Sequence, residues 1–378
     1  MAAAQVPTQP QAPQQVWQMQ DSGTKVSLRG IDSVDGQVAW ASGNGGTILK
    51  TIDGGAHWQK CTFPDAGTDG VTLDFRGVQA FDAWTAIVMA SGPDQKSRLY
   101  RTADGCVTWD LVLTNHDPEG FFDAIHMTSR KTGILISDPV KGTFYIRGLS
   151  IKQHVHGFPL YATVDGGETW RKIDDGLLEA REDKDGNSAE SIFAASNSSM
   201  LDLGSGNQMA FITGGAGSSL HFVQYTNVAN TLQCKGPCST VVTTDSTFAG
   251  GKTAGGFSLA ANLDHSGAPI IVAVGGDFNR PDASEGTSAT CLIKSKGKNE
   301  CKASATPPHG YRSAVAYDAT LQAFVAAGPN GSDISRDDGK TWAPLDNGAW
   351  NALSLPFIVG PGGRIGKLNP AALAPEKR

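Results

Sequence analysis

The chain has 378 residues, a net charge of −6, 46 glycines and only 18% charged residues. This composition is typical of many short strands joined by turns, and an acidic balance without a basic run argues against a nucleic-acid partner. No apolar stretch approaches the roughly 18–20 residues that a membrane helix needs, so we expect no membrane span.

The chain begins with MAAAQVPTQPQAPQQ (1–15), which is rich in Ala, Pro and Gln. We therefore expect residues 1–14 to form a disordered lead-in, whose small residues would suit the remains of a processed export signal. Residues 15–370 are predicted to form one folded unit, and residues 371–378 a C-terminal tail.

An eight-residue motif that ends in Trp occurs four times, as TIDGGAHW (51–58), TADGCVTW (102–109), TVDGGETW (163–170) and SRDDGKTW (335–342). Its hydroxyl and Asp side chains can bond nearby backbone amides, and Gly at the fifth position supplies a positive φ. The motif therefore predicts a hairpin corner, with structural roles for Asp53, Asp104, Asp165 and Asp337 and for Trp58, Trp109, Trp170 and Trp342. Cys106 replaces the glycine in the second copy, which implies a different turn or backbone strain there.

The spacing of the closing tryptophans sets a repeat length. The gaps are about 51, 61 and 172 residues, and the last equals three periods of about 57, so two degenerate repeats lie between 170 and 342. Each repeat opens with an alternating strand, expected at 28–34, 75–81, 122–128, 191–197, 256–262, 311–317 and 350–356. A second strand is expected at 39–46, 86–92, 133–139, 210–217, 271–277, 323–329 and 356–363.

These repeats predict an all-β fold, a seven-bladed β-propeller with four-stranded blades. The last repeat lacks a fourth strand, which QVWQMQ (15–20) can supply, so that the N-terminal strand closes the ring and removes exposed edges. The aspartates of the four motifs would then lie on separate blades, too far apart to act on one substrate.

The cysteine spacing suggests two local disulfides. Cys234 and Cys238 lie four residues apart, and Cys291 and Cys301 lie ten apart, so each pair could close a loop. Free thiols are the alternative, and the spacings fit a zinc site poorly. Disulfides would place the protein outside the cytosol, in a periplasm or secreted. Cys61 and Cys106 have no obvious local partner.

A family resemblance rests on an ordered set of phrases: GTILKTIDGGAHW (46–58), ISDPVKGTF (136–144), TGGAG (213–217), VAVGGDF (272–278), GYRSAVAY (310–317) and GPNGSDISRDDGKTW (328–342). The motif resembles the Asp-box repeats of sialidases, some endoglucanases and sorting receptors. The whole set, over about residues 24–368, is similar to the photosystem II assembly-factor-like propellers and their bacterial relatives labelled only "oxidoreductase". This resemblance implies a seven-bladed propeller and transfers no catalytic residue. No βαβ pattern supports a dinucleotide fold, and we expect no cofactor.

Polar residues recur where the inner strands of a propeller would line its central channel. The candidate binding residues are Arg29, Arg76, Asp123, Asp138, Glu190, Asp277 and Arg312. Arginines there would hold a carboxylate or phosphate, and acids would meet hydroxyl groups. Alternatively, these charges pair with one another and only stabilise the ring.

We therefore predict an exported, monomeric propeller that acts as a binding or assembly scaffold for a protein partner or an anionic or polyhydroxyl small molecule. The alternative is a glycoside hydrolase of the sialidase or two-carboxylate type, with Asp123, Asp138 and Glu190 as candidate catalytic residues. Such a pair must lie roughly 5–10 Å apart. The RIP-type phrase of sialidases is missing. The pair His154 and His156 and the loop DKDGNSAE (183–190) resemble metal sites only weakly, so we predict no metal.

Overall fold

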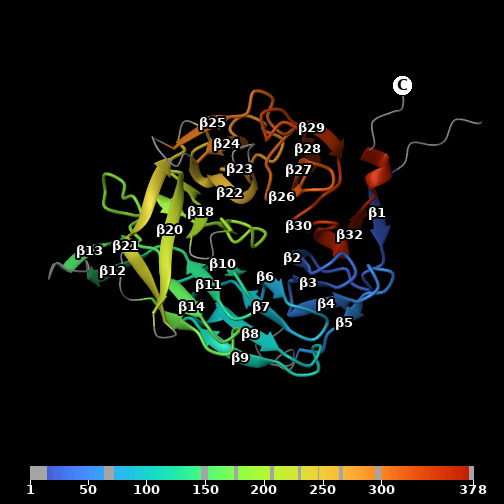
Figure 1. Ribbon diagram of the computed structural model, residues 1–378, viewed down its shortest axis with the longest axis horizontal. Helices are drawn as coiled ribbons and strands as arrows, with labels where there is room; N and C mark the ends of the chain where they lie inside the picture. The colour runs from blue at the N-terminus through green and yellow to red at the C-terminus, as the bar shows by residue number, and fades with distance from the viewer. Residues whose placement is uncertain are drawn as a thin grey trace, which may run out of the picture.

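The computed structural model describes residues 15–63, 72–145, 152–173, 178–204, 208–228, 231–245, 247–263, 267–293 and 299–373. Within these ranges, seven antiparallel sheets follow one another around a ring (Figure 1). Six sheets have four strands, and the fifth blade belongs to a six-stranded sheet. The predicted seven-bladed all-β propeller is confirmed. The expected lead-in at 1–14 and residues 374–378 of the tail lie outside the described residues.

The blades are numbered in chain order. Blade one contains β2 (Leu28–Ser33), β3 (Ala39–Gly43), β4 (Thr47–Thr51) and β5 (Gln59–Lys60). Blade two contains β6 (Phe75–Ala80), β7 (Ala86–Ala90), β8 (Arg98–Thr102) and β9 (Asp110–Thr114). Blade three contains β10 (Phe122–Met127), β11 (Gly133–Ser137), β14 (Leu160–Thr163) and β15 (Arg171–Lys172). Blade four contains β17 (Met200–Asp202), β18 (Gln208–Ile212), β20 (Ser219–Val228) and β21 (Thr231–Thr243).

Blade five contains β22 (Gly251–Leu263), β23 (Pro269–Asp277), β24 (Ser288–Leu292) and β25 (Glu300–Ala303). Its sheet also receives β16 (Glu190–Ser191) and β19 (Gly214–Gly215). Blade six contains β26 (Ala314–Asp318), β27 (Ala323–Gly328), β28 (Gly331–Ser335) and β29 (Ala343–Asp346). Blade seven contains β30 (Ala352–Ser354), β31 (Phe357–Val359), β32 (Ile365–Leu368) and β1 (Trp17–Gln20). A separate hairpin of β12 (Val140–Tyr145) and β13 (Lys152–Gly157) projects outward from blade three (Figure 1).

The two ends of the chain meet in blade seven. Strand β1 pairs with β32, with Trp17 opposite Leu368, so blue and red ribbons lie side by side in Figure 1. The Trp17 indole packs on Trp350 and donates a hydrogen bond to Ser332 in blade six. The N-terminal strand thus closes the ring, as predicted, by adding the fourth, outermost strand of the last blade beside β32.

The core lies between neighbouring blades. The second strands β3, β7 and β11 are buried along their whole length because each is covered on both faces. Trp109 meets Trp40 of blade one at 6.3 Å between ring centroids, and Trp58 meets Phe357 of blade seven at 5.7 Å. Each of these two motif tryptophans therefore packs against the preceding blade.

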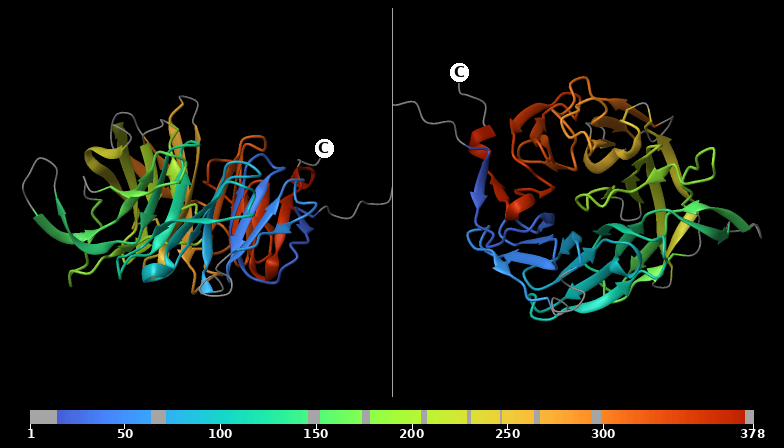
Figure 2. Two further views of the ribbon diagram at one scale, coloured as in Figure 1. Left: turned by 90° about the horizontal axis from the view of Figure 1, so that it is seen from below. Right: turned by 180° about the vertical axis from the view of Figure 1, so that it is seen from behind.

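The prediction of an innermost strand at 191–197 is wrong. Only Ser191 belongs to a strand, and β17 takes the innermost position of blade four. Residues 192–199 instead reach into the centre of the ring, where both face views show a yellow-green segment (Figures 1 and 2). We call this segment the channel plug. Its alternating pattern resembled a strand, but its polar groups bond to several blades.

Candidate functional site

The Asp-box corners are held by their own side chains. In every copy the leading hydroxyl accepts a hydrogen bond from the backbone amide of the fifth residue, at 2.9 to 3.1 Å. The Asp carboxylate accepts a hydrogen bond from the backbone amide of the seventh residue. In the first copy, the His57 amide donates to Asp53 Oδ1 at 2.9 Å. Hydrogen bonds from His57 hold the pKa of Asp53 at about 2. These carboxylates are therefore occupied within their own loops, on four different blades.

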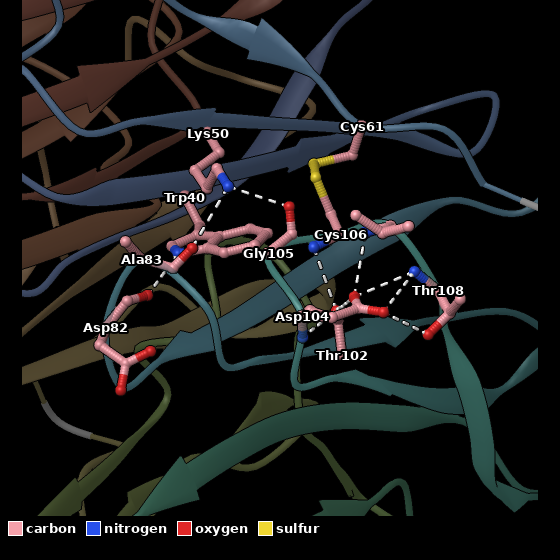
Figure 3. Close-up of a disulfide and its surroundings, with 11 residues drawn as sticks. Trp40, Lys50, Cys61, Asp82, Ala83, Thr102, Asp104, Gly105, Cys106 and Thr108 are labelled. Atoms are coloured by element: carbon pink, nitrogen blue, oxygen red, sulfur yellow. Dashed lines mark hydrogen bonds between the residues drawn. A yellow bond between two sulfur atoms is a disulfide. The ribbon is translucent and has the colours of Figure 1, made fainter.

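Cys106 keeps the same corner despite replacing glycine. Its φ is 72°, and its amide donates to Thr102 Oγ1 like the glycines of the other copies. Its sulfur is bonded to Cys61 of blade one (Figure 3). Beside this bond, Lys50 of blade one donates to the carbonyls of Gly105 and Ala83 (Figure 3). Cys61 and Cys106, for which the sequence offered no local partner, are thus bonded to each other across the interface between blades one and two.

The predicted pair Cys291 and Cys301 also forms a disulfide, between β24 and β25. The side chains of Cys234 and Cys238 lie outside the described part of the chain, as does that of His154. His156 Nδ1 lies 2.8 Å from Glu182 Oε1. In the residues that the structure describes, no group of three or more His, Cys, Asp or Glu side chains could hold a metal ion.

The channel plug bonds to the blades on both sides of the channel. The Ala194 carbonyl accepts a hydrogen bond from Arg76 of blade two, and Asn197 Nδ2 donates to the Val78 carbonyl. Asn197 Oδ1 accepts the Ile125 amide of blade three at 2.8 Å. Two serines bond to the blades on the opposite side. The Ser198 hydroxyl forms a hydrogen bond with the Ser258 hydroxyl of blade five, and the Ser196 hydroxyl donates to the Ser313 carbonyl beside blade six. The plug therefore divides the channel into two separate mouths.

Two arginines open into the mouth above Phe193 and Ala194. We call this pocket, of about 440 Å³, the arginine mouth; Arg29, Arg76, Tyr311 and Asn351 are among its lining residues. Arg76 Nε donates to Asp74 at 2.7 Å. Arg29 makes no hydrogen bond or ion pair with any described residue, and its Nε is buried. Burial and the neighbouring Arg76 lower the pKa of Arg29, against the opposing charges of Asp74 and Tyr311, so an anion placed here would relieve an existing electrostatic cost.

Aromatic rings form the other wall of the arginine mouth. Phe193 of the plug stacks on Phe257 of blade five, with centroids 4.1 Å apart and planes 5° apart. Phe278 and Tyr311 meet Phe257 edge to face. Such a wall can accept an apolar or aromatic group of a ligand whose acidic group faces the arginines.

A β-bulge points the inner-strand residues toward the channel. The register of the inner strand slips by one residue at Arg29, Arg76, Asp123 and Phe257, each of which is skipped in the pairing with its neighbour. A bulge re-aims the side chain of the extra residue. The sequence signal for Arg29, Arg76 and Asp123 was a polar residue at the start of each expected inner strand, and the aromatic wall gave none.

The acids predicted for the channel fall into separate environments. Asp123 is 1% exposed, and neither of its carboxyl oxygens has a hydrogen-bond partner. Burial first, and then the nearby Asp138, raise its pKa well above the usual value. Burial raises the pKa of Asp138 to about 7, and its Oδ1 accepts the Ile192 amide at the start of the plug. Asp138 thus contacts the start of the plug, and the two acids lie close enough to influence each other.

Glu190 is fully buried and belongs to a separate network. Its carboxylate accepts the Arg181 amide and the Thr213 hydroxyl, and its Oε2 lies 3.5 Å from His221 Nε2. Burial by itself would raise the pKa of Glu190, but His221 and the Arg181 amide outweigh it and hold the pKa below its usual range. Arg181 also forms two hydrogen bonds with Asp245. This network ties the segment before the plug to blade four.

Arg312 and Asp277 are each held by a neighbouring charge. The Arg312 guanidinium is completely buried and bonds to Asp333 and to Asn330 Oδ1. Asp277 accepts hydrogen bonds from Arg280 and Thr253. Of the seven predicted binding residues, the described lining of the arginine mouth contains only Arg29 and Arg76.

The fold and this site define a seven-bladed propeller with a plugged channel and one cationic mouth. Solved structures share the fold: YCF48 bound to a D1 peptide, at 14% identity and a TM-score of 0.54 over 96% of this chain and 97% of that one, and YCF48 from Cyanidioschyzon merolae, at 16% identity and 0.54 over 94% and 99%. No family model matches the sequence, and no curated protein does. The described residues include no helix that is long and apolar enough to cross a membrane.

Proposed function

We propose that the protein is an assembly or binding scaffold that holds an acidic segment of a protein partner at the arginine mouth. The observation that carries this proposal is Arg29, a half-buried arginine whose Nε is buried without a hydrogen-bond partner among the described residues, beside a second arginine and an open pocket. A buried cation of this kind costs stability unless an anion binds it. A binding site can carry this loss of stability in the free protein because the bound anion removes it.

The shape of the pocket favours a peptide that carries an apolar side chain beside its acid. The arginines lie on one side and the stacked Phe193 and Phe257 on the other, so neighbouring side chains of an extended strand could contact both. A propeller of the same fold, YCF48, has been solved with a D1 peptide, which supports a peptide ligand here.

The test is binding of a fluorescein-labelled pentapeptide with the core Phe-Asp-Leu, measured by anisotropy. We expect Arg29→Gln and Arg76→Gln to weaken binding at least tenfold, because a charge-assisted hydrogen bond contributes about 1.5–3 kcal/mol. Lys172→Gln on the outer strand β15 is the matched control and should leave affinity unchanged. Equal binding by Arg29→Gln would contradict the proposal, as would the absence of binding to any acidic peptide.

Export and a monomeric state are parts of the same proposal. The two disulfides at Cys61–Cys106 and Cys291–Cys301 support an oxidising compartment. Alkylation of denatured protein without reductant should leave all four of these cysteines unmodified. Light scattering coupled to gel filtration tests the monomer.

No contact described here favours the glycoside-hydrolase alternative over the scaffold. Its test is a screen on sialosides and aryl glycosides. If the wild type turns over one of these substrates and Glu190→Gln does not, the hydrolase replaces the scaffold as the proposed function.

A further inference from the structure

A second pocket lies at the other mouth of the channel, on the far side of the plug. It has a volume of about 420 Å³ and takes its floor from Ser196, Asn197 and Ser198, whereas the arginine mouth is lined by Phe193, Ala194 and Ala195. Its walls come from later positions of the same inner strands, Asp32 in β2 and Gln79 in β6. We call this pocket the Asp32 mouth. The two mouths are separate sites because the plug lies between them.

The charge of the Asp32 mouth is opposite to that of the arginine mouth. None of its described lining residues is Lys or Arg. Asp32 accepts the Ala80 amide at 2.7 Å but forms no ion pair with any described residue. Burial raises the pKa of Asp32 to about 6, against the opposing effects of the Ala80 amide and the Ser354 hydroxyl. At pH 7.5 the carboxylate is therefore mostly ionised, poorly solvated and without a cation.

Two further polar groups in this pocket are unused. Neither the His126 ring nor the Tyr317 hydroxyl has a hydrogen-bond partner among the described residues, and both line the pocket. Burial lowers the pKa of His126, against the opposing charge of Asp202, so the imidazole is neutral at pH 7 and adds no positive charge. A neutral imidazole and a phenol oxygen can each accept a hydrogen bond.

The remaining surface of the pocket is apolar. Val315, Leu353 and Leu355 lie on the side of blades six and seven, and Leu259 and Ala261 on the side of blade five. A ligand that fits has a compact cationic head with several donors and an apolar stem. An ammonium group carries three donors on one atom, whereas a guanidinium is a planar fork that favours a bidentate carboxylate.

We propose that the Asp32 mouth binds a primary ammonium group on an alkyl stem, with Asp32 as its counterion. The chemistry is that of a small alkylamine or of a lysine side chain presented by another protein. This site is independent of the arginine mouth and needs neither Arg29 nor Arg76.

The probes are n-butylamine for the free amine and Nα-acetyl-lysine N-methylamide for the side chain, with the Nε-acetylated lysine derivative as the neutral analogue. Binding is followed by calorimetry at pH 7.5 and by amide chemical shifts. We expect saturable binding of at least one amine at millimolar concentrations, shifts at residues of the pocket, and no binding of the acetylated analogue. Binding of butylamine alone would assign a small-molecule ligand, and binding of the lysine derivative a lysine side chain.

Asp32→Asn is the decisive variant because the amide oxygen can still accept the Ala80 amide while the charge is lost. We expect it to weaken amine binding at least tenfold. Asp110→Asn, on the exposed first position of outer strand β9, is the matched control and should bind as the wild type does. Arg29→Gln should also bind amines normally, so this proposal and the proposed function can fail separately.

A proton readout separates an ion pair from simple packing. Because the pKa of Asp32 is about 6, binding at pH 6 should release about half a proton, seen as a heat that depends on the ionisation enthalpy of the buffer. The release should vanish in Asp32→Asn. Amine binding that is unchanged in Asp32→Asn would overturn the proposal, and so would the absence of saturable binding by both amines.

Discussion

Cys106 of blade two is disulfide-bonded to Cys61 of blade one, with 5.6 Å between their Cα atoms. The same residue has a φ of 72°, in a corner where the other copies of the motif use glycine. A side chain at positive φ costs on the order of 1 kcal/mol. The covalent bond across two blades offsets this cost, since it constrains the unfolded chain.

Removing the disulfide should destabilise the protein by an amount that depends on residue 106. The bond spans a sequence separation of 45 residues, for which chain entropy predicts about 4 kcal/mol. We expect Cys61→Ala with Cys106→Gly to be about 1 kcal/mol more stable than Cys61→Ala with Cys106→Ala, because only glycine adopts this φ freely. Urea unfolding of both variants without reductant measures the difference. Equal stability would mean that the corner is unstrained.

Asp138 should make stability fall as the pH rises. Its folded pKa of about 7 lies above the usual value of 3.8, so the folded protein binds more protons than the unfolded chain between these limits. The stabilisation is fully present below about pH 4 and is lost as the pH approaches 7. Asp138→Asn keeps an acceptor for the Ile192 amide, so its stability relative to wild type should rise by about 1–3 kcal/mol from pH 4 to pH 7. Denaturant unfolding at several pH values measures the stability difference between the variant and the wild type. A difference that does not change with pH would exclude a raised pKa at Asp138.

The half-buried Arg29 and the fully buried Arg312 should respond in opposite directions to the same substitution. Arg29→Met removes an unpaired guanidinium and should stabilise the fold by about 1 kcal/mol while abolishing binding of acidic peptides. Arg312→Met leaves the buried Asp333 without its arginine, with His309 as its remaining partner, and should cost about 3–5 kcal/mol. Thermal and urea unfolding compare the two. A large loss of stability in Arg29→Met would mean that Arg29 serves the fold.

The plug should loosen when Asn197 is shortened. Its amide side chain joins Ile125 of blade three to Val78 of blade two, so Asn197→Ala leaves the Ile125 amide without an acceptor. We expect a loss of about 1–3 kcal/mol and faster hydrogen exchange at Ile125. The Val315 amide, which bonds to Ser258 Oγ instead, is the internal reference. Unchanged exchange at Ile125 would show that this anchor does not hold the plug.

Several features of the fold could be predicted because they are local and repeated. The four Asp boxes set the period, and the missing fourth strand of the last repeat indicated that the N-terminal strand completes blade seven, where Trp17 lies opposite Leu368. The pair Cys291 and Cys301 could be predicted from its short spacing. The pair Cys61 and Cys106 could not, because its contact exists only when two blades pack together.

The candidate site was only partly predictable. Arg29 and Arg76 were found because each is a polar residue near the start of an expected inner strand, where it would line the channel. Their neighbour Phe193 was assigned to a strand, since the alternation in SIFAASN has the period of a strand whether or not a neighbouring strand pairs with it. The aromatic wall and the Asp32 mouth join residues from several blades that no local pattern connects.

The sequence by itself determined the number of blades, the corners of the hairpins and the closure of the ring, because these depend on turn chemistry and on strand period within each repeat. Only the tertiary structure decided the role of each charge. Arg29 and Arg312 both lie on the inner side of a blade, yet Arg312 is neutralised by Asp333 and Arg29 faces the pocket without a partner. That difference arises from which side chains the ring and its plug bring together, and the cost of a buried charge depends on those neighbours.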